Sequence, residues 1–324
     1  MNGQNININP GHIARHTPRG AGAQGRDAAI IDIAQDLLLR QLHENGNLEN
    51  MAFKGGTALR KLYAGAEGRF SLDLDFSIVH IGSVPDETLM NLIEAVDGAR
   101  IGPFRYSMKE RRGKWSVAYE YDFSGVIMQS SKLDISPPPW LSPIFREWVP
   151  MPVQKQYGAP GLPSIRTIRL EENIAEKIAR LNRATPARDL YDLIWVVKNP
   201  NITGKLDKAL IRRLAVLKIW VDANGIRAKN TEWKPGHESN PFDPAEWLRD
   251  RSQGDFDAED IGALAVPVPT AKELSDAIRI HYSFLADLDD DEHLLAAIRE
   301  VDRPVALKLL SELPDHRLSG IGLY

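Results

Sequence analysis

Two aspartates stand two residues apart in the apolar run SLDLDFSI. Residues two apart on a β-strand share one face, so the backbone positions of Asp73 and Asp75 would lie about 6–7 Å apart. Two carboxylates held that close repel each other, and a divalent cation relieves the repulsion by binding both. Magnesium suits this role because it binds one or two carboxylates together with substrate phosphates. The spacing therefore predicts a metal site that serves a phosphate-bearing substrate.

A glycine pair precedes these aspartates. The tetrapeptide Lys54-Gly55-Gly56-Thr57 follows a short predicted strand and opens a predicted helix. Backbone amides at a helix N-terminus bind phosphate, and glycines let the phosphate approach closely. Lys54 would add a positive charge and Thr57 a hydroxyl. This junction predicts a phosphate-binding turn next to the metal site.

A third carboxylate, Asp134, lies in the segment KLDIS at the end of a later predicted strand. Such carboxylate sets commonly hold metal ions for in-line phosphoryl displacement. The alternative for the aspartate pair is an exposed edge strand, with both carboxylates in water opposite a core face of Leu72, Leu74 and Phe76. The pair alone leaves both interpretations open, and the glycine turn together with Asp134 favours the metal site.

Two amphipathic segments, LEENIAEKIARLNRA and ARDLYDLIWVVKN, predict helices later in the chain. Lys177 borders the apolar stripe of the first, where a long side chain can extend toward a triphosphate. A surface salt bridge with Glu172 or Glu176 is the alternative. Asp189 and Asp192 are i, i+3 neighbours on the second helix, and Asp189 would cap that helix in its alternative interpretation.

The pattern along the chain predicts three parts. Residues 1–25 are rich in Asn, Gly, His and Arg and lack hydrophobic periodicity, which predicts a flexible N-terminal arm. Residues 26–165 combine helical segments with the β-like runs FRYSMKERR, KWSVAYEYDF and VIMQSSKLDIS, punctuated by Gly113 and Gly125. Residues 166–324 are mostly helical in pattern. We therefore expect an α/β domain followed by an α-helical C-terminal domain.

Composition excludes several classes of protein. Of the 324 residues, 43% are hydrophobic and 26% charged, as in ordinary soluble globular proteins. No apolar run approaches the ~18 residues of a membrane span, and the N-terminus lacks the apolar core of a signal peptide. The absence of cysteine excludes disulfides and thiolate catalysis and fits a cytoplasmic protein. The net charge of −4 means that any contact with RNA requires a local basic patch.

Two blocks of the sequence resemble a known family. GGTALRKLY…RFSLDLDFSI and LEENIAEKIARLNRATPARDLYDLIWV are similar, in this order, to the G-G/S…D-x-D and E-E-x-x-A-E-K…R-D-x-Y-D-L segments of the AbiEii/AbiGii-type nucleotidyltransferase toxins. These toxins belong to the DNA polymerase β-like nucleotidyltransferase superfamily. The resemblance implies an α+β protein, in which a mixed β-sheet with flanking helices is followed by an α-helical C-terminal domain.

The resemblance also implies roles for particular residues. In that family the first block binds the nucleotide phosphates and the metal, a role that carries over to Gly55, Gly56, Ser71, Asp73 and Asp75, with Lys54 just before the glycines. The second block supplies a lysine and an aspartate needed for activity. These match Lys177, which would also contact the nucleotide, and either Asp189 or Asp192.

The expected function is transfer of NMP from an NTP to an acceptor, dependent on Mg²⁺ or Mn²⁺. Asp73 and Asp75 would hold the metal, and Asp134 would complete the metal site or deprotonate the acceptor hydroxyl. Lys177 would neutralise charge on the leaving pyrophosphate. The alternatives are a nucleotidyltransferase that modifies a protein or a small molecule, and a catalytically silent nucleotide-binding module.

The resemblance implies a toxin of a type IV toxin–antitoxin or phage-defence system. Its partner would be an antitoxin encoded nearby that acts as a transcriptional regulator, and RNA, for example the tRNA 3′ end, would be the acceptor. We expect no contact with a membrane. The basic segments at residues 109–114 and 211–218 would either contact RNA phosphates or form solvated faces.

Overall fold

The computed structural model of the chain describes residues 6–19, 21–80, 85–122, 128–157, 164–225, 239–252 and 256–316. The chain forms two compact units. The first comprises Met1–Pro137, Pro143–Thr167 and Gly262–Pro267, and the second comprises Pro138–Ser142, Ile168–Ile261 and Val268–Tyr324. Residues 138–142 and 262–267 therefore belong to the unit other than the one that flanks them in sequence, which the sequence did not predict.

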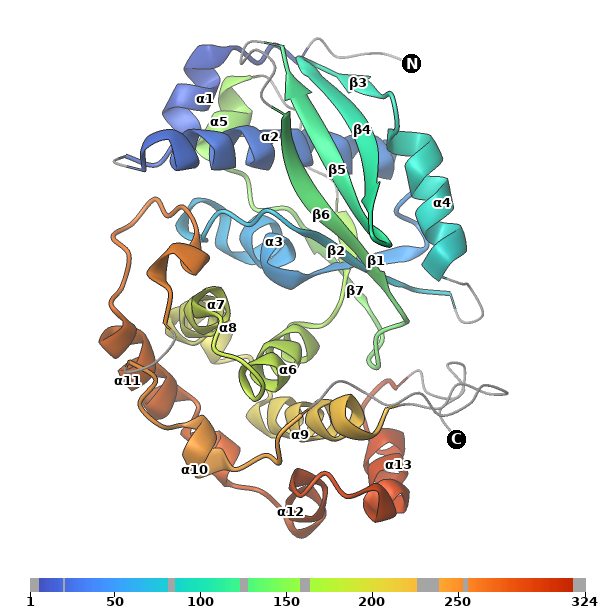
Figure 1. Cartoon of the computed structure of the whole chain (residues 1–324), viewed down its shortest axis with the longest axis vertical. Helices are drawn as coiled ribbons and strands as arrows, with labels where there is room; N and C mark the ends of the chain where they lie inside the picture. Colours follow the sequence, from blue (N-terminus) through green and yellow to red (C-terminus); the bar gives the residue numbers. More distant parts are fainter. Residues whose placement is uncertain are drawn as a thin grey trace. The chain divides into compact units, whose positions relative to one another are not determined.

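Within the described residues, the first unit contains a mixed sheet of eight strands in the order β3-β4-β5-β6-β2-β1-β8-β7 (Figure 1). β2 (Leu74–Ile78) pairs antiparallel with β1 (Met51–Lys54) and parallel with β6 (Met128–Ser136). The other strands are β3 (Arg100–Ile101), β4 (Phe104–Arg111), β5 (Lys114–Tyr121), β7 (Ile144–Glu147) and β8 (Ser164–Thr167). The predicted mixed sheet is confirmed, and the predicted β runs form β4, β5 and β6.

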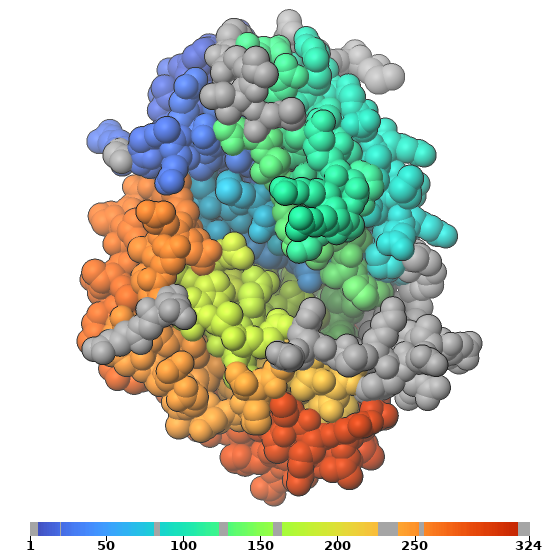
Figure 2. Space-filling model, in the orientation of Figure 1, coloured from blue at the N-terminus to red at the C-terminus, as the bar shows by residue number. Residues whose placement is uncertain are grey.

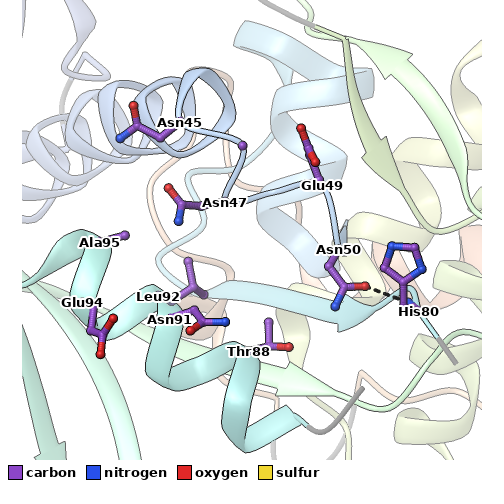
Figure 3. Close-up of a pocket in the computed structure, with 11 residues that line it drawn as sticks. Asn45, Asn47, Glu49, Asn50, His80, Thr88, Asn91, Leu92, Glu94 and Ala95 are labelled. Atoms are coloured by element: carbon purple, nitrogen blue, oxygen red, sulfur yellow. Dashed lines mark hydrogen bonds between the residues drawn. The ribbon is translucent and has the colours of Figure 1, made fainter. Parts of the chain in front are cut away.

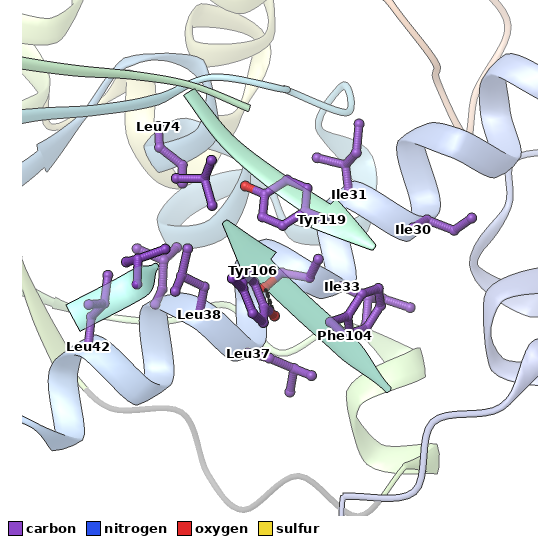
Figure 4. Close-up of a cluster of buried hydrophobic side chains, with 14 of the residues drawn as sticks. Ile30, Ile31, Ile33, Leu37, Leu38, Leu42, Leu74, Phe104, Tyr106 and Tyr119 are labelled. Atoms are coloured by element: carbon purple, nitrogen blue, oxygen red, sulfur yellow. Dashed lines mark hydrogen bonds between the residues drawn. The ribbon is translucent and has the colours of Figure 1, made fainter. Parts of the chain in front are cut away.

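Alternation along these strands separates a core face from a polar face. Helix α2 (Gly22–Glu44) passes behind β4, β5 and β6 in Figure 1, and Figure 4 shows its Leu37 and Leu38 beside Tyr106 of the sheet and its Ile31 near Tyr119. The hydroxyl of Tyr106 donates a hydrogen bond to the carbonyl oxygen of Ala34 in α2 (2.9 Å). Because successive strand residues point to opposite faces, the residues between these core positions lie on the other face.

The position of β2 decides between the two interpretations of its aspartates. β2 lies between β6 and β1, so it is a central strand, and the edge-strand interpretation is wrong. Leu74 and Phe76 are buried, as that interpretation also required, but Leu72 is 45% exposed. The strand begins at Leu74, so Leu72 lies in the preceding loop and does not follow the alternation of the strand.

The expected flexible arm contains a helix. α1 (Pro10–His16) begins after Asn9, whose Oδ1 accepts hydrogen bonds from the backbone amides of Gly11 (3.0 Å) and His12 (3.2 Å). Ile8 and Ile13 are buried in the core of the first unit. The prediction of a flexible arm was therefore wrong for these residues, because an Asn cap and two isolated isoleucines suffice to fold a segment whose composition is polar.

Five buried charged or polar groups connect α2 to the turn after α3 (Gly55–Leu59). In the π-helical turn η1 (Arg60–Ala64), Arg60 Nε and Nη2 donate to the two carboxylate oxygens of Asp32 (3.0 and 3.1 Å). Lys61 Nζ donates to Asp32 Oδ1 (2.9 Å) and to Asp36. Gln154 Nε2 donates to Asp36 Oδ2 (2.8 Å). Burial opposes ionisation of Asp32, but the charges of Arg60 and Lys61 hold its pKa well below the usual range.

The segment before β2 is backed by residues from far along the chain. The backbone amide of Phe70 donates to the carbonyl oxygen of Ala263 (2.9 Å), in the segment 262–267 of the first unit. The guanidinium of Arg60 lies 3.8 Å from the centroid of the Phe70 ring. The loop that leads into the aspartate pair is thus held on two sides. The remaining elements of this unit are η2 (Gly65–Glu67), α4 (Pro85–Val96) and α5 (Pro152–Gln156).

The second unit is helical in its described residues. Its helices and turns are α6 (Leu170–Leu181), α7 (Ala187–Lys198), α8 (Pro200–Thr203), α9 (Lys208–Asn224), α10 (Pro244–Trp247), η3 (Ala258–Ile261), α11 (Ala271–His281), η4 (Ser283–Ala286), α12 (Asp290–Ala296), η5 (Glu300–Asp302) and α13 (Arg303–Ser311). α6 packs against α9, and α7 packs against α11. Across the described parts of both units, we find no helix long and apolar enough to cross a bilayer.

The basic segment 211–218 of α9 is occupied by ion pairs. Arg212 pairs with Glu292 (2.7 Å), and Lys218 pairs with Glu172 (3.0 Å). Arg213 Nη2 lies 3.0 Å from Asp289 Oδ2. These cations hold helices of the second unit together, so carboxylates of the same unit balance their charge.

We predict that Lys61→Met lowers the free energy of unfolding by about 3–5 kcal/mol, because it leaves the buried carboxylates of Asp32 and Asp36 short of a cation. The double variant Lys61→Met/Asp36→Asn should recover part of the lost free energy of unfolding, since it also removes the carboxylate of Asp36, which would otherwise lack a cation. Urea titration followed by circular dichroism measures both. The control Lys155→Met replaces an exposed cation of α5 and should cost less than about 0.5 kcal/mol. A loss below about 1 kcal/mol for Lys61→Met would contradict the assignment.

Candidate active site

Two carboxylates and a lysine meet on one face of the sheet, and a third carboxylate stands just before the central strand. Asp75 is the register neighbour of Asp134 in the parallel strand β6 and of Lys54 in the antiparallel strand β1. Neighbouring strands lie about 4.8 Å apart, and register neighbours point to the same face. Asp73 stands immediately before β2, two residues from Asp75. The structure thus brings Asp75, Asp134 and Lys54 together on adjacent strands, as expected. Asp73, which was expected on the same strand as Asp75, lies just outside it, and its negative charge still acts on Asp75.

Crowding of like charges perturbs Asp75. Burial, followed by the negative charge of Asp73, raises the pKa of Asp75 to about 6, and Asp134 adds to the rise. The positive charges of Lys54 and Lys132 offset only part of it. Oxygen donors whose mutual repulsion is not fully offset fit a hard divalent cation. In the described residues, no three His, Cys, Asp or Glu side chains form a set that could hold a metal alone, so further oxygen ligands would have to come from substrate or water.

The glycine pair allows two groups of side chains to reach the backbone. Gly55 has φ +77°, and a methyl group there would overlap the carboxylate of Asp75. A methyl group on Gly56 would overlap the guanidinium of Arg69 and lie 2.9 Å from Ser71 Oγ. We expected these glycines to admit phosphate. In the structure they admit the carboxylate of Asp75 on one side and Arg69 with Ser71 on the other.

Thr57 and Ser71 are both buried at this junction. The hydroxyl of Thr57 donates to the backbone carbonyl of Asp73. This contact joins the first turn of α3 to the residue before β2 and gives Thr57 a structural role. Ser71, in the segment before β2, lies next to Gly56 of the turn at which the sequence predicts phosphate binding.

Sequence reasoning missed Arg69. Its side chain is buried, with 7% of the residue exposed, and its guanidinium lies against Gly56. A buried cation beside the glycine turn supplies charge where the sequence predicts phosphate. The available signal was its place two residues before Ser71 in RFSLDLDF, but nothing in the local pattern distinguishes a buried arginine from an exposed one.

In the second unit, Lys177 lies between two aspartates. Its Nζ donates to Asp189 Oδ1 and to Asp192 Oδ2, each at 2.8 Å, and all three residues are buried. Arg180 Nη1 lies 3.2 Å from Asp189 Oδ2 as an ion pair without hydrogen-bond geometry. The two candidate aspartates therefore share one lysine. The proposed cap is wrong for Asp189, because its carboxylate faces these cations and Pro186 occupies the cap position.

The predicted alternative for Lys177, a surface salt bridge with Glu172 or Glu176, is wrong. Glu172 is buried and accepts hydrogen bonds from the backbone amides of Trp140 (2.9 Å) and Leu141 (3.1 Å). It thereby fixes the segment 138–142 onto α6. Glu172 of the second block is thus structural, whereas the lysine of that block holds two carboxylates.

A pocket of about 700 Å³ in the first unit lies at the other end of β1 and β2 (Figure 3). Asn50 precedes β1 and His80 follows β2, so the pocket opens away from Lys54 and Asp75. Among its lining residues are Asn45, Asn47 and Glu49, and they include neither lysine nor arginine. A triphosphate would find no cation there. The candidate active site is therefore the end of β1 and β2 at which Lys54, Asp75 and Asp134 lie.

Comparison with known proteins agrees with this geometry. A family model described as the nucleotidyl transferase AbiEii toxin of type IV toxin–antitoxin systems matches residues 36–280. Among solved structures, MenT4, a nucleotidyltransferase toxin from Mycobacterium tuberculosis, is 33% identical, with a TM-score of 0.79 over 94% of this chain and 99% of that chain.

Another match, an antigenic nucleotidyltransferase-like protein from Paracoccidioides brasiliensis, is 15% identical over 52% of this chain and 73% of that chain, with a TM-score of 0.33. No curated protein sequence matches the chain. The family match spans the glycine turn, the aspartate pair and the helical block around Lys177, so the predicted resemblance is confirmed. The chain belongs to the AbiEii family of nucleotidyltransferase toxins from type IV toxin–antitoxin systems.

Proposed function

We propose that the chain transfers NMP from an NTP to the 3′ hydroxyl of an RNA, with tRNA as the first candidate, and that the transfer depends on Mg²⁺, which Mn²⁺ can replace. Membership of the family brings with it an NTP substrate, a divalent metal and an antitoxin partner. The observation that carries the proposal is the row formed by Asp134, Asp75 and Lys54 across β6, β2 and β1, with Asp73 beside it.

Asp73 and Asp75 would hold the divalent cation, and Asp134 lies next to Asp75 on the neighbouring strand. When bound, the cation neutralises phosphate charge and orients the triphosphate for in-line displacement. Lys54 and Arg69 would contact the phosphates from the glycine side, because both cations lie at the Gly55–Gly56 turn. The Ser71 hydroxyl and the backbone amides of the turn would donate hydrogen bonds to phosphate oxygens.

The transfer step exchanges one P–O bond for another. The acceptor hydroxyl oxygen attacks the α-phosphorus, the bond from that phosphorus to the bridging oxygen of the β-phosphate breaks, and pyrophosphate leaves. We assign to Asp134 the acceptance of the hydroxyl proton. Lys177, the lysine of the second block, would serve activity from the second unit, where Asp189 and Asp192 hold its ammonium in place.

We further propose that the antitoxin is a transcriptional regulator encoded nearby and that the pair acts in the cytoplasm, where it restricts phage. Growth arrest on expression, relieved by Asp73→Ala, follows from a catalytic toxin. Arrest by Asp73→Ala as strong as that by the wild type would contradict the catalytic account.

Incubation of the chain with labelled NTPs, Mg²⁺ and total RNA tests the reaction. We expect label in an RNA band of tRNA size and at least about a 10²-fold lower rate for Asp73→Ala, because a metal-holding carboxylate is lost. The control Glu120→Gln removes an exposed carboxylate at the far end of the same sheet and should retain the wild-type rate. Label on protein or on a small molecule would overturn the RNA acceptor, and NTP binding without turnover would overturn catalysis.

The repulsion around Asp75 predicts that Asp75→Asn stabilises the metal-free protein while it abolishes transfer. Because the pKa of Asp75 is raised from 3.8 to about 6, the wild type loses stability as pH rises through that interval, and the variant does not. The gain should reach up to about 3 kcal/mol at pH 7.5 and shrink to about 1 kcal/mol at pH 4.5. Urea titrations with EDTA at the two pH values measure it. Equal stability of the two proteins at pH 7.5 would contradict the assigned repulsion.

The position of Arg69 predicts that it binds the triphosphate. Arg69→Gln should raise KM for the NTP roughly 10- to 100-fold, the loss of one charge-assisted hydrogen bond. Gly56→Ala should act in the same direction because its methyl group displaces the guanidinium. Arg105→Gln, on the exposed far end of the sheet, is the control. Unchanged KM in both Arg69→Gln and Gly56→Ala, with urea midpoints like the wild type, would exclude Arg69 from the phosphate site.

A further inference from the structure

The polar face of the sheet carries cations at its hairpin end. Register pairs Arg111 with Lys114 and Lys109 with Ser116 across β4 and β5, and pairs Ser116 with Lys132 across β5 and β6. Register neighbours point to one face, and side chains alternate along each strand. This face therefore carries four exposed cations, which we call the basic track: Lys109, Arg111, Lys114 and Lys132.

The basic track leads into the carboxylates of the candidate active site. Lys132 stands two residues before Asp134 on β6, so the two share the face. The last paired residues of β5 and β6 are Trp115 and Leu133. Continuing that antiparallel register by one residue places Lys114 opposite Asp134. The charge of Lys132 also offsets part of the rise that burial gives the pKa of Asp75, which places the ammonium near that carboxylate.

A single row thus crosses five strands of the sheet. It runs from Arg111 on β4 through Lys114, Asp134 and Asp75 to Lys54 on β1. With about 4.8 Å between neighbouring strands, the two ends lie about 19 Å apart. One triphosphate cannot contact cations at both ends. A chain of phosphates can extend from the hairpin end while the NTP occupies the glycine end.

The basic track differs from the other cations of this face in its partners. Among the described residues, none of its members lies within 4.0 Å of a carboxylate, so none forms an ion pair. At the far end of the same face, Arg105 pairs with Glu120 (3.6 Å) and Arg100 pairs with Asp122 (3.8 Å). In Figure 2, β4, β5 and β6, coloured teal to green, lie at the surface. The cations of this face that carry no ion pair are therefore those of the basic track, on the side of the candidate active site.

We propose that the basic track binds the phosphate backbone of the acceptor nucleic acid and directs its end to Asp134, opposite the glycine turn that binds the NTP. This rests on the proposed function, since it assigns a surface to the acceptor of that reaction. In-line displacement requires the attacking and leaving oxygens on opposite sides of the phosphorus. The row supplies cations on both sides of the carboxylates, Lys114 and Arg111 toward the acceptor and Lys54 toward the leaving pyrophosphate.

The test compares two double variants that each remove two arginine or lysine charges from this face. Lys109→Gln/Arg111→Gln alters the part of the basic track two strands away from Asp134, and Arg100→Gln/Arg105→Gln alters the far end. Anisotropy of end-labelled, unfractionated tRNA at several salt concentrations gives the affinity. The track variant should bind at least about tenfold more weakly at 0.1 M salt and should lower the slope of log K against log salt by about 1.4. The far-end variant should match the wild type.

Transfer kinetics and NTP binding complete the test. The track variant should raise KM for tRNA with little change in kcat and should bind a non-hydrolysable NTP as tightly as the wild type. If the wild type labels tRNA and the track variant matches it in affinity and KM, the basic track is overturned and the proposed function stands. If the label enters a protein or a small molecule, both the proposed RNA acceptor and the proposed role of the basic track are overturned. If the track variant loses affinity for the purified antitoxin and keeps its affinity for tRNA, the surface binds that protein and the proposal is overturned.

Discussion

The buried pairing of Asp32 with Arg60 and Lys61 is the interaction on which the first unit depends. It joins α2, the long helix under the sheet, to the π-helical turn η1 that follows α3. Charges removed from water require partners in well-defined positions, so this contact fixes where the chain leaves α3. The position of η1 in turn constrains the segment that follows it, up to Asp73. Arg60 and Lys61, which follow the glycine turn in the motif, therefore hold the site in place through Asp32.

The site itself works against folding. Asp75 is placed beside two other carboxylates and against the backbone of Gly55, and its raised pKa reflects the cost. Glycine with positive φ adds backbone freedom that folding must remove. The aromatic and aliphatic packing of α2 on the sheet and the buried ion pairs of the same unit offset these terms. The crowded carboxylates of the candidate site are tolerated because the packing and ion pairs of the surrounding unit outweigh their cost.

Local patterns predicted much of this arrangement. The glycine turn and the alternating strands depend on neighbours in sequence, and the structure places them as expected, whereas Asp73 lies just before the strand that was expected to carry it. The register of Asp134 with Asp75 depends on pairing between strands about sixty residues apart in sequence, which periodicity does not encode. The burial of Arg69 and the hydrogen bonds from Lys177 to Asp189 and Asp192 likewise depend on tertiary packing, which local patterns do not encode. The helix at residues 10–16 escaped prediction because two isoleucines outweigh a polar composition.

The hydrogen bond between Phe70 and Ala263 has a consequence for the synthesis of this toxin. The loop before the aspartate pair is completed only by residues 262–267, made about one hundred residues after the last strand of the sheet. At about 5–20 residues per second, the ribosome needs on the order of 5–20 s to supply them. A chain that ends before residue 262 therefore carries Asp73, Asp75 and Asp134 without the hydrogen bond that supports the loop in front of them.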